Sequence, residues 1–228
     1  MELEKITKRH YEDACGTAHA LDLVGERWGL LVLRELLLGP RRFGDLRASL
    51  PGISANVLTQ RLDGLEASGV VRRRVLPPPA SVQVYELTEW GREIEPVVLA
   101  LGRWGARSPA QDVTMPLSGV SMMLSFRAMF DPARARDCDL SLRFRVGPES
   151  FTLHVRDGAM TVDRGAAGAV DAELSGPPAK ICAATYGFER LEDLEREGTV
   201  EMGGDREAFR RFSTLFAFPE KAPRCSRE

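Results

Sequence analysis

Residues 41–85, RRFGDLRASLPGISANVLTQRLDGLEASGVVRRRVLPPPASVQVY, decide the fold of the first half of this chain. Leu50-Pro51-Gly52-Ile53 is typical of a tight turn, and Ser54 follows where a helix N-cap belongs. Its hydroxyl can accept a hydrogen bond from the exposed amides of the first helical turn. The pattern therefore predicts a short helix before the turn and a second helix from about Ala55.

The second helix has two different faces. Leu58, Leu62 and Leu65 recur at spacings of four and three residues, so they share one face and pack inward. The opposite face carries Asn56, Thr59, Gln60 and Asp63. Short side chains that form hydrogen bonds are what reading base edges in a major groove requires. Taken alone, however, a polar helix face is more often a solvated surface.

A basic hairpin follows this helix. Gly69 ends the helix, and the arginine-rich segment after it is predicted to be extended. Pro77-Pro78-Pro79 cannot donate hydrogen bonds to a strand ladder, so the prolines must lie at the tip between strands 70–76 and 82–87. Helix, turn, capped second helix and basic hairpin occur in the order of a winged helix-turn-helix, which favours DNA binding over a solvated surface.

The charge of the chain supports this interpretation locally. The whole chain has 31 Lys and Arg against 33 Asp and Glu, a net charge of -2, which does not indicate a nucleic-acid binder. Between residues 41 and 74, however, the chain contains seven arginines and only three acidic residues. A local basic surplus is what steers binding to a polyanion.

Composition indicates an ordinary soluble protein of two domains. The chain has 228 residues, 43% of them hydrophobic and 28% charged, which is long for one domain and comfortable for two. No apolar run approaches the ~20 residues that span a bilayer, and the N-terminus lacks the apolar core of a secretory signal. We therefore expect a cytoplasmic protein without membrane association.

Catalytic and metal sites are not indicated. Cys15, Cys138, Cys182 and Cys225 are widely scattered, without the paired spacing of a zinc site or a redox pair. The three histidines form no metal-spaced pair, and neither a phosphate-cradling glycine loop nor a nucleophile elbow is present. We expect no enzymatic activity, no metal and no cofactor.

Three segments, RWGLLVLREL, GPRRFGDL and YELTEWG, occur in this order around the predicted helix and wing. From Cys15 to Trp104 the chain resembles the HxlR family of bacterial winged helix-turn-helix regulators. The resemblance implies a homodimer on a two-fold double-stranded DNA operator, with the helix in the major groove and the wing against the minor groove or backbone. The implied base contacts are Ser54, Asn56, Thr59, Gln60 and Arg61. The implied phosphate contacts are Arg41, Arg42, Arg72, Arg73 and Arg74.

Cys15 falls where some members of this family carry a thiol that senses oxidants or electrophiles. Such sensing needs an accessible thiolate with a lowered pKa, and the sequence shows neither. Cys15 is therefore a possible redox sensor, and a purely structural cysteine is the alternative.

A helix after the wing carries a long apolar stripe. Thr88 is predicted to cap it, and it would run to about Arg107. The stripe consists of Ile94, Val97, Val98, Leu101 and Trp104. It is longer than a small winged domain needs to cover itself, so we expect a dimer interface. The alternative is packing on the first helix or on the C-terminal half.

The C-terminal half begins after a linker at residues 108–116. A helix rich in Met and Phe is predicted over Gly119 to Phe130, followed by three or four alternating strands in an antiparallel meander with one buried face. Helices from Pro178, from Leu191 and after the cap Asp205 complete the pattern. The expected fold is α+β, with domains at 1–107 and 117–228.

The strand meander, the DAELSG strand and GTVEMGGDREAFRRF together are similar to domains of the sterol carrier protein type 2 class. The similarity covers about Leu117 to Phe218 and implies a sandwich of sheet and helices that encloses an apolar tunnel. The candidate pocket residues are Met122, Met123, Phe126, Met129, Phe130, Phe151, Met160, Phe212 and Phe216. Each of them would also serve as ordinary core packing.

The leading hypothesis is a dimeric transcriptional regulator whose C-terminal domain binds a hydrophobic small molecule and thereby changes operator affinity. One alternative is a carrier or sequestering protein for an apolar metabolite. Another is a regulator whose C-terminal domain serves only oligomerisation.

Overall fold

The structure is a computed structural model that describes residues 11–166 and 168–223. The chain divides after Ile94 into two compact units, which we describe separately. No helix within the described ranges is long and apolar enough to cross a membrane.

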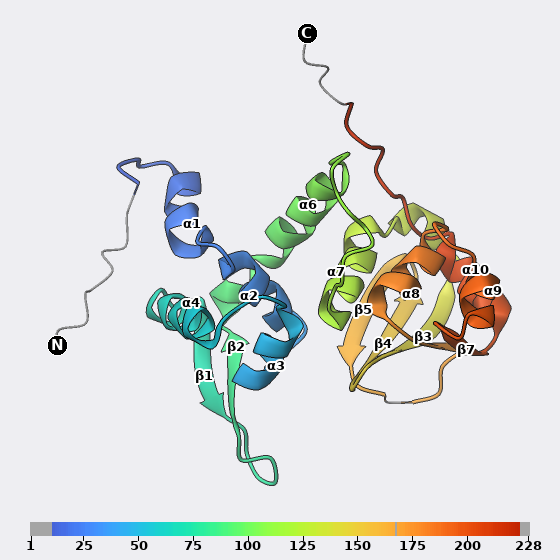
Figure 1. Cartoon of the computed structure of the whole chain (residues 1–228), viewed down its shortest axis with the longest axis horizontal. Helices are drawn as coiled ribbons and strands as arrows, with labels where there is room; N and C mark the ends of the chain where they lie inside the picture. Colours follow the sequence, from blue (N-terminus) through green and yellow to red (C-terminus); the bar gives the residue numbers. More distant parts are fainter. Residues whose placement is uncertain (1–10, 167, 224–228) are drawn as a thin grey trace. The chain divides into compact units, whose positions relative to one another are not determined.

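The N-terminal unit contains the predicted helix-turn-helix and wing (Figure 1). Its elements are α1 (Gly16–Val24), α2 (Gly29–Leu36), α3 (Phe43–Ser49), α4 (Ala55–Ala67), β1 (Val71–Val75), β2 (Gln83–Leu87) and α5 (Glu89–Arg92). Strands β1 and β2 pair antiparallel from Val71↔Leu87 to Val75↔Gln83, so the three prolines lie between them as predicted. The α+β class with an N-terminal winged helix-turn-helix is confirmed.

Leucines from three helices form the core of this unit. Leu33, Leu46, Leu58 and Leu62 are fully buried, and Leu65 and Val71 pack in the same cluster. Burying one such side chain contributes about 1.5 to 3 kcal/mol. The leucine face of α4 is therefore fixed inward, and its polar face is fixed outward.

The helix predicted from Thr88 to about Arg107 is broken in two. Thr88 caps α5, accepting a hydrogen bond from the amide of Gly91 at 3.0 Å, and α6 (Glu95–Ala106) starts after a two-residue break. Pro96 explains the break, because it has no amide to donate to the carbonyl of Arg92 and its ring crowds the preceding turn.

The C-terminal unit combines helices with a five-stranded sheet (Figure 1). Its elements are α6, α7 (Gly119–Met129), η1 (Pro132–Ala135), β3 (Asp139–Val146), β4 (Glu149–Arg156), β5 (Ala159–Arg164), β6 (Ala172–Ser175), α8 (Pro178–Thr185), α9 (Leu191–Arg196), β7 (Glu201–Gly204) and α10 (Arg206–Ser213).

The strand order is β5-β4-β3-β6-β7. Strands β3, β4 and β5 form the predicted antiparallel meander, but β6 lies parallel to β3, from Leu142↔Ala172 to Arg145↔Ser175. The expectation of a wholly antiparallel sheet was therefore wrong for β6. Alternation along a strand identifies its buried face, but it does not identify the neighbouring strand.

Aromatic rings join the sheet to its helices. Phe126 of α7 lies 5.4 Å from Phe144 of β3 and 5.5 Å from Phe212 of α10, measured between ring centroids. All three side chains are fully buried. Helices α7 and α10 therefore cover the same face of the sheet, and rings from both fill the space between.

Within the C-terminal unit, α6 packs on α7. Arg127 pairs with Glu95 at 2.6 Å, and Arg103 donates to the carbonyl of Ala128 at 3.0 Å. The sequence places the stretch of α6 in domain 1–107, whereas the contacts place it in the unit that begins at Glu95. The domain boundaries 1–107, 108–116 and 117–228 stay a prediction.

Candidate nucleic-acid interface

Helix α4 presents a polar face to solvent. Ser54 caps it by accepting a hydrogen bond from the amide of Val57 at 3.2 Å. With its leucines buried, the side chains of Asn56, Thr59 and Gln60 are all exposed. Exposed amide and hydroxyl groups at the N-terminal end of a helix can form hydrogen bonds with base edges in a major groove. The predicted base contacts other than Arg61 thus lie together on one accessible surface.

The Arg61 side chain points toward the turn between α1 and α2. Its guanidinium pairs with Glu26, in the α1–α2 turn, at 3.3 Å, and the arginine side chain is only 24% exposed. It would have to leave this pair to contact a base or a phosphate. Its contact with DNA stays a prediction.

Two wing arginines that share a strand face converge on one carboxylate. Arg72 Nε lies 2.7 Å from Glu86 Oε1, and Arg74 Nη2 lies 3.0 Å from Glu86 Oε2. The antiparallel register causes this, since it places Arg72 directly opposite Glu86 on β2. The Glu86 side chain is only 5% exposed, whereas both arginines remain about half exposed.

Arg73 points to the other face of the hairpin, where it meets α4. It forms ion pairs with Asp63 and, at 2.9 Å, with Glu66, and its guanidinium carbon lies 5.5 Å from the ring centroid of Tyr85. We call Arg73, Asp63, Glu66 and Tyr85 the Arg73 cluster. The cluster attaches the wing to the helix beside it.

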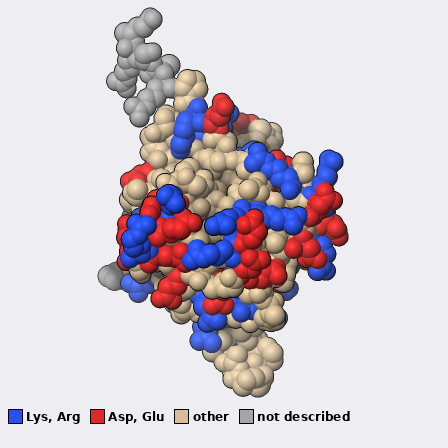
Figure 2. Space-filling view, turned by 90° about the vertical axis from the view of Figure 1, so that its right-hand side faces the viewer, with Lys and Arg blue, Asp and Glu red and all other residues tan. Residues whose placement is uncertain are grey.

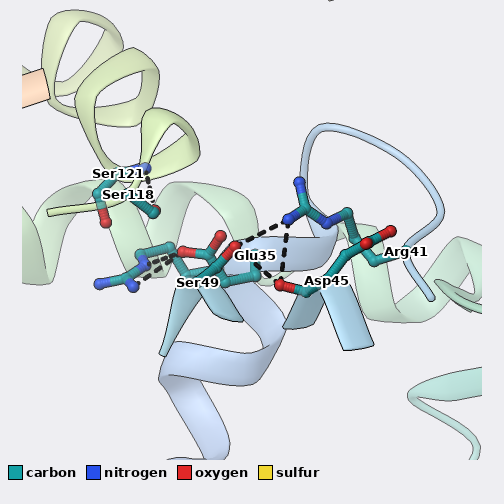
Figure 3. A network of polar contacts seen from close by, with 7 residues as sticks. Glu35, Arg41, Asp45, Ser49, Ser118 and Ser121 are labelled. Atoms are coloured by element: carbon teal, nitrogen blue, oxygen red, sulfur yellow. Dashed lines mark hydrogen bonds and ion pairs between the residues drawn. The ribbon is translucent and has the colours of Figure 1, made fainter. Parts of the chain in front are cut away.

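Arg41 has a different position from the one expected of a phosphate contact. It is only 5% exposed, and its backbone bridges to Tyr85 of β2 through hydrogen bonds of 2.9 and 2.8 Å. Figure 3 shows its guanidinium directed at Ser49, at 2.8 Å from Oγ, and at the carbonyl of Asp45, at 3.3 Å. Arg41 therefore connects the wing to α3, and its contact with a phosphate stays a prediction. Arg42, by contrast, is exposed at the N-cap position of α3, where a phosphate could reach it.

The carboxylate partners of these arginines were missed in the sequence. They are Glu26, Asp63, Glu66 and Glu86. The sequence predicted a strand on each side of the prolines, but it did not predict the register that sets Glu86 opposite Arg72.

The stripe predicted as a dimer interface divides in the structure. Val97, Leu101 and Trp104 are 48, 44 and 74% exposed on one face of α6, since they are spaced by four and three residues. Val98 is half-buried. Ile94 precedes α6 and packs against the core of the N-terminal unit.

Cys15 is exposed at the N-cap position of α1. The backbone amides of Thr17 and Ala18 lower the pKa of the Cys15 thiol from its usual value, and the Thr17 hydroxyl adds to this effect. Burial instead raises the pKa of Cys138, and it raises that of Cys182 to about 12. Cys225 lies outside the described residues. Accessibility and a lowered pKa are the two conditions that the sequence alone did not show.

The predicted pocket residues lie between the sheet and its helices. Phe130 and Met160 are half-buried, and the other seven are buried. Rings also extend from this core toward the surface: Tyr186 lies 5.2 Å from Phe218 and 6.0 Å from the exposed Phe188. The Tyr186 hydroxyl is 2.7 Å from that of Ser125. These outer residues were not predicted. Among the described residues, no His, Cys, Asp and Glu side chains gather into a group that could hold a metal ion.

Comparison with known proteins assigns the N-terminal half of the chain to a protein family. Residues 23–112 match the family described as HxlR-like helix-turn-helix. The uncharacterized HTH-type transcriptional regulator sll1512 of Synechocystis sp. is 45% identical over 92 residues, which make up 40% of this chain and 68% of that protein. The chain belongs to the HxlR-like helix-turn-helix family.

Other relatives of this HxlR-like protein agree. The HTH-type transcriptional regulator YodB of Bacillus subtilis is 36% identical over 85 residues, 37% of this chain and 76% of YodB. These relatives indicate a DNA-binding transcriptional regulator. Among solved structures, the oxidized form of the redox regulator HypR is 36% identical, covers 40% of this chain and 94% of its own, and has a TM-score of 0.38. The reduced form of YodB is 32% identical, covers 44% and 100%, and has a TM-score of 0.39.

The C-terminal half of the HxlR-like protein matches a different family. Residues 109–222, half of the chain, belong to the family described as alkyl sulfatase C-terminal. This match does not confirm a sterol carrier-like domain, which stays a prediction.

Proposed function

We propose that this protein is a dimeric, sequence-specific DNA-binding transcriptional regulator whose C-terminal domain binds a hydrophobic effector. The observation that carries the proposal is the Ser54-capped helix α4, which exposes Asn56, Thr59 and Gln60 while its leucines are buried. Side chains that read bases must reach the groove on a rigid element, and α4 is anchored along its whole inner face. A regulator of this kind acts in the cytoplasm, as the sequence predicted.

The residues of the proposed interface would have different roles in binding DNA. Asn56, Thr59 and Gln60 would set sequence preference, whereas Arg42 would contribute affinity and salt dependence through a phosphate. Arg72, Arg73 and Arg74 would reach phosphates only by sharing or leaving their carboxylates.

Dimerisation is supported by α6. Three large apolar side chains on one helix face are exposed to water. An exposed apolar patch of this kind is typical of a surface that a partner covers. A two-fold operator is bound by a two-fold protein, so the exposed face of α6 would join two copies.

The proposal for the effector rests on the C-terminal unit. Its buried Met and Phe side chains lie between a sheet and helices, the place where the sterol carrier-like resemblance puts an apolar ligand. Flexible methionines such as Met122 and Met123 adapt to ligands of varied shape. A purely structural core would contain the same residues, so the ligand itself must be tested.

The function is tested by a double substitution on α4. We expect T59A/Q60A to lose about 1 to 3 kcal/mol of discrimination between a duplex enriched from a random pool by the wild-type protein and a scrambled duplex. Fluorescence anisotropy on both duplexes measures it. Arg42→Ala is the matched control, since it would weaken binding to both duplexes equally and reduce the salt slope of binding by about 1. Unaltered affinity and preference in T59A/Q60A would show that α4 does not read the bases.

A further inference from the structure

Arginines and carboxylates are balanced around α4 and the wing. Residues 41–74 contain seven arginines and only three acidic residues. In the folded chain, the second strand of the hairpin and the α1–α2 turn bring further acidic side chains next to these arginines. The ion pairs are Arg61–Glu26, Arg72–Glu86, Arg74–Glu86, Arg73–Asp63 and Arg73–Glu66. Four positive side chains thus meet four negative ones, and their formal charges cancel.

The acids of α4 and the wing fall into two kinds. Glu86 is 5% exposed and is bound by two arginines, so it is a fixed part of the wing. Asp63 and Glu66 are 53 and 36% exposed, and the Arg73 that they share is 40% exposed. Exposed ion pairs contribute little to stability and are screened by salt, so Arg73 can exchange these partners for a phosphate.

Asp63 and Glu66 also lie close to the proposed base contacts. They belong to α4, and Asp63 follows Gln60 by three residues, about one helical turn along the same face. A phosphate that approaches the wing beside α4 therefore meets two carboxylates together with Arg73.

From this arrangement we infer that Asp63 and Glu66 are specificity-determining residues, which weaken binding to DNA in general by holding Arg73 in ion pairs. The inference rests on the proposed DNA-binding function. Non-specific binding comes almost entirely from cations that neutralise phosphates, so an arginine already paired with carboxylates contributes less to it. On the operator, base contacts from α4 supply the affinity, so binding there depends less on Arg73 reaching a phosphate than binding to other sequences does. Repulsion built against the wrong partner is a general route to specificity.

The test compares two duplexes. The operator duplex is one enriched by the wild-type chain from a random pool, and the competitor is a scrambled duplex of equal length and composition. For D63N/E66Q in the full chain, we expect the Kd for the scrambled duplex to fall about tenfold at ~0.15 M salt and the operator Kd to fall less. The salt slope on the scrambled duplex should steepen by about 1, because Arg73 becomes available to one more phosphate.

The matched control removes the same charges elsewhere. Asp193 and Glu207 form exposed pairs with Arg196 at 3.0 Å and with Arg210 at 3.4 Å in the C-terminal unit. Basic and acidic side chains are interspersed over the molecular face in Figure 2. D193N/E207Q changes net charge by the same amount, and we expect it to change the ratio of the two Kd values by less than about twofold.

A third variant shows whether Arg73 carries the effect. Adding Arg73→Gln to D63N/E66Q should return the salt slope on the scrambled duplex to the wild-type value. If the triple variant keeps the steeper slope, or if D63N/E66Q alters the Kd ratio no more than the control, the inference is wrong. Each single variant is measured as well, so that a folding defect in the double variant, seen by circular dichroism, does not decide the result. Failure of the wild-type protein to enrich any sequence would instead overturn the proposed function.

Discussion

At the scale of single residues, the Cys15 thiol is chemically distinct from the buried thiols. It is exposed at the start of α1, where the amides of Thr17 and Ala18 lower its pKa. The thiolate is the reactive form, so its fraction at neutral pH is larger than in an ordinary cysteine. We expect iodoacetamide to label Cys15 before Cys138 and Cys182, with a pH midpoint below the usual thiol value. Peptide mass spectrometry over a pH series measures this.

Thr17 provides the control for this prediction. Thr17→Val removes the hydroxyl and leaves the backbone amides in place, so the midpoint should rise only slightly. A midpoint for the wild-type protein at or above that of an ordinary thiol would contradict the structure and with it a sensing role for Cys15.

Gly91 is a second residue whose identity is dictated by its surroundings. A Cβ at this position would lie 2.1 Å from the carbonyl oxygen of Val70, which accepts the amide of Thr88 at 3.1 Å. Backbone must therefore move to admit any side chain. We expect Gly91→Ala to lower the free energy of unfolding by about 1 to 3 kcal/mol, measured by urea denaturation followed by tryptophan fluorescence.

Gly64 is the matched control for Gly91. It lies inside α4, and a Cβ at this position would meet no neighbouring atom within 4 Å outside the helix's own backbone. Gly64→Ala should therefore leave stability unchanged or raise it by about 0.5 to 1 kcal/mol. Equal losses in the two variants would show that the close approach at Gly91 is not the cause.

At the scale of elements, the short helices and the wing follow closely from local chemistry. Ser54, Thr88 and Asp205 cap the helices predicted for them, and each accepts a hydrogen bond from a backbone amide in the first turn. The partners of Arg72 and Arg41 were not predictable in the same way. Each partner depends on how β1, β2 and α3 come together, which no local pattern specifies.

The exposed face of α6 makes a prediction about assembly. If Leu101 and Trp104 lie in a dimer interface, L101S/W104S should weaken the dimer at least tenfold, since buried tryptophans dominate such interfaces. Sedimentation velocity over a concentration series measures it. Trp90→Ser is the control, because Trp90 is also 50% exposed but lies on α5 outside the stripe. An unchanged monomer–dimer equilibrium in L101S/W104S would exclude this face as the dimer contact.

At the scale of the whole molecule, the proposed regulator must couple ligand binding to DNA binding. A ligand can shift operator affinity only by binding two states of the protein differently, typically by about 5- to 150-fold. We expect at least one compound from a panel of fatty acids, sterols and aromatic acids to raise the thermal stability of the protein and to alter its operator Kd. Differential scanning fluorimetry followed by anisotropy measures both.

The outcomes of this experiment separate the three hypotheses for the C-terminal unit. A compound that binds and changes operator affinity supports a regulated DNA binder. Binding without any change in operator Kd supports a carrier. Native mass spectrometry that finds no bound apolar compound, with no thermal shift across the panel, supports a domain for oligomerisation only.

The sequence by itself determined the winged helix-turn-helix, the caps of its helices and the buried face of each strand, because these depend on side chains a few residues apart. The tertiary structure decided what contacts what over longer separations. It placed β6 beside β3, buried Arg41 against Ser49, and set Glu86 between two arginines of the opposite strand. The reason is physical: periodicity records which side of an element avoids water, whereas an ion pair or a strand pairing forms only between groups that the completed fold brings together.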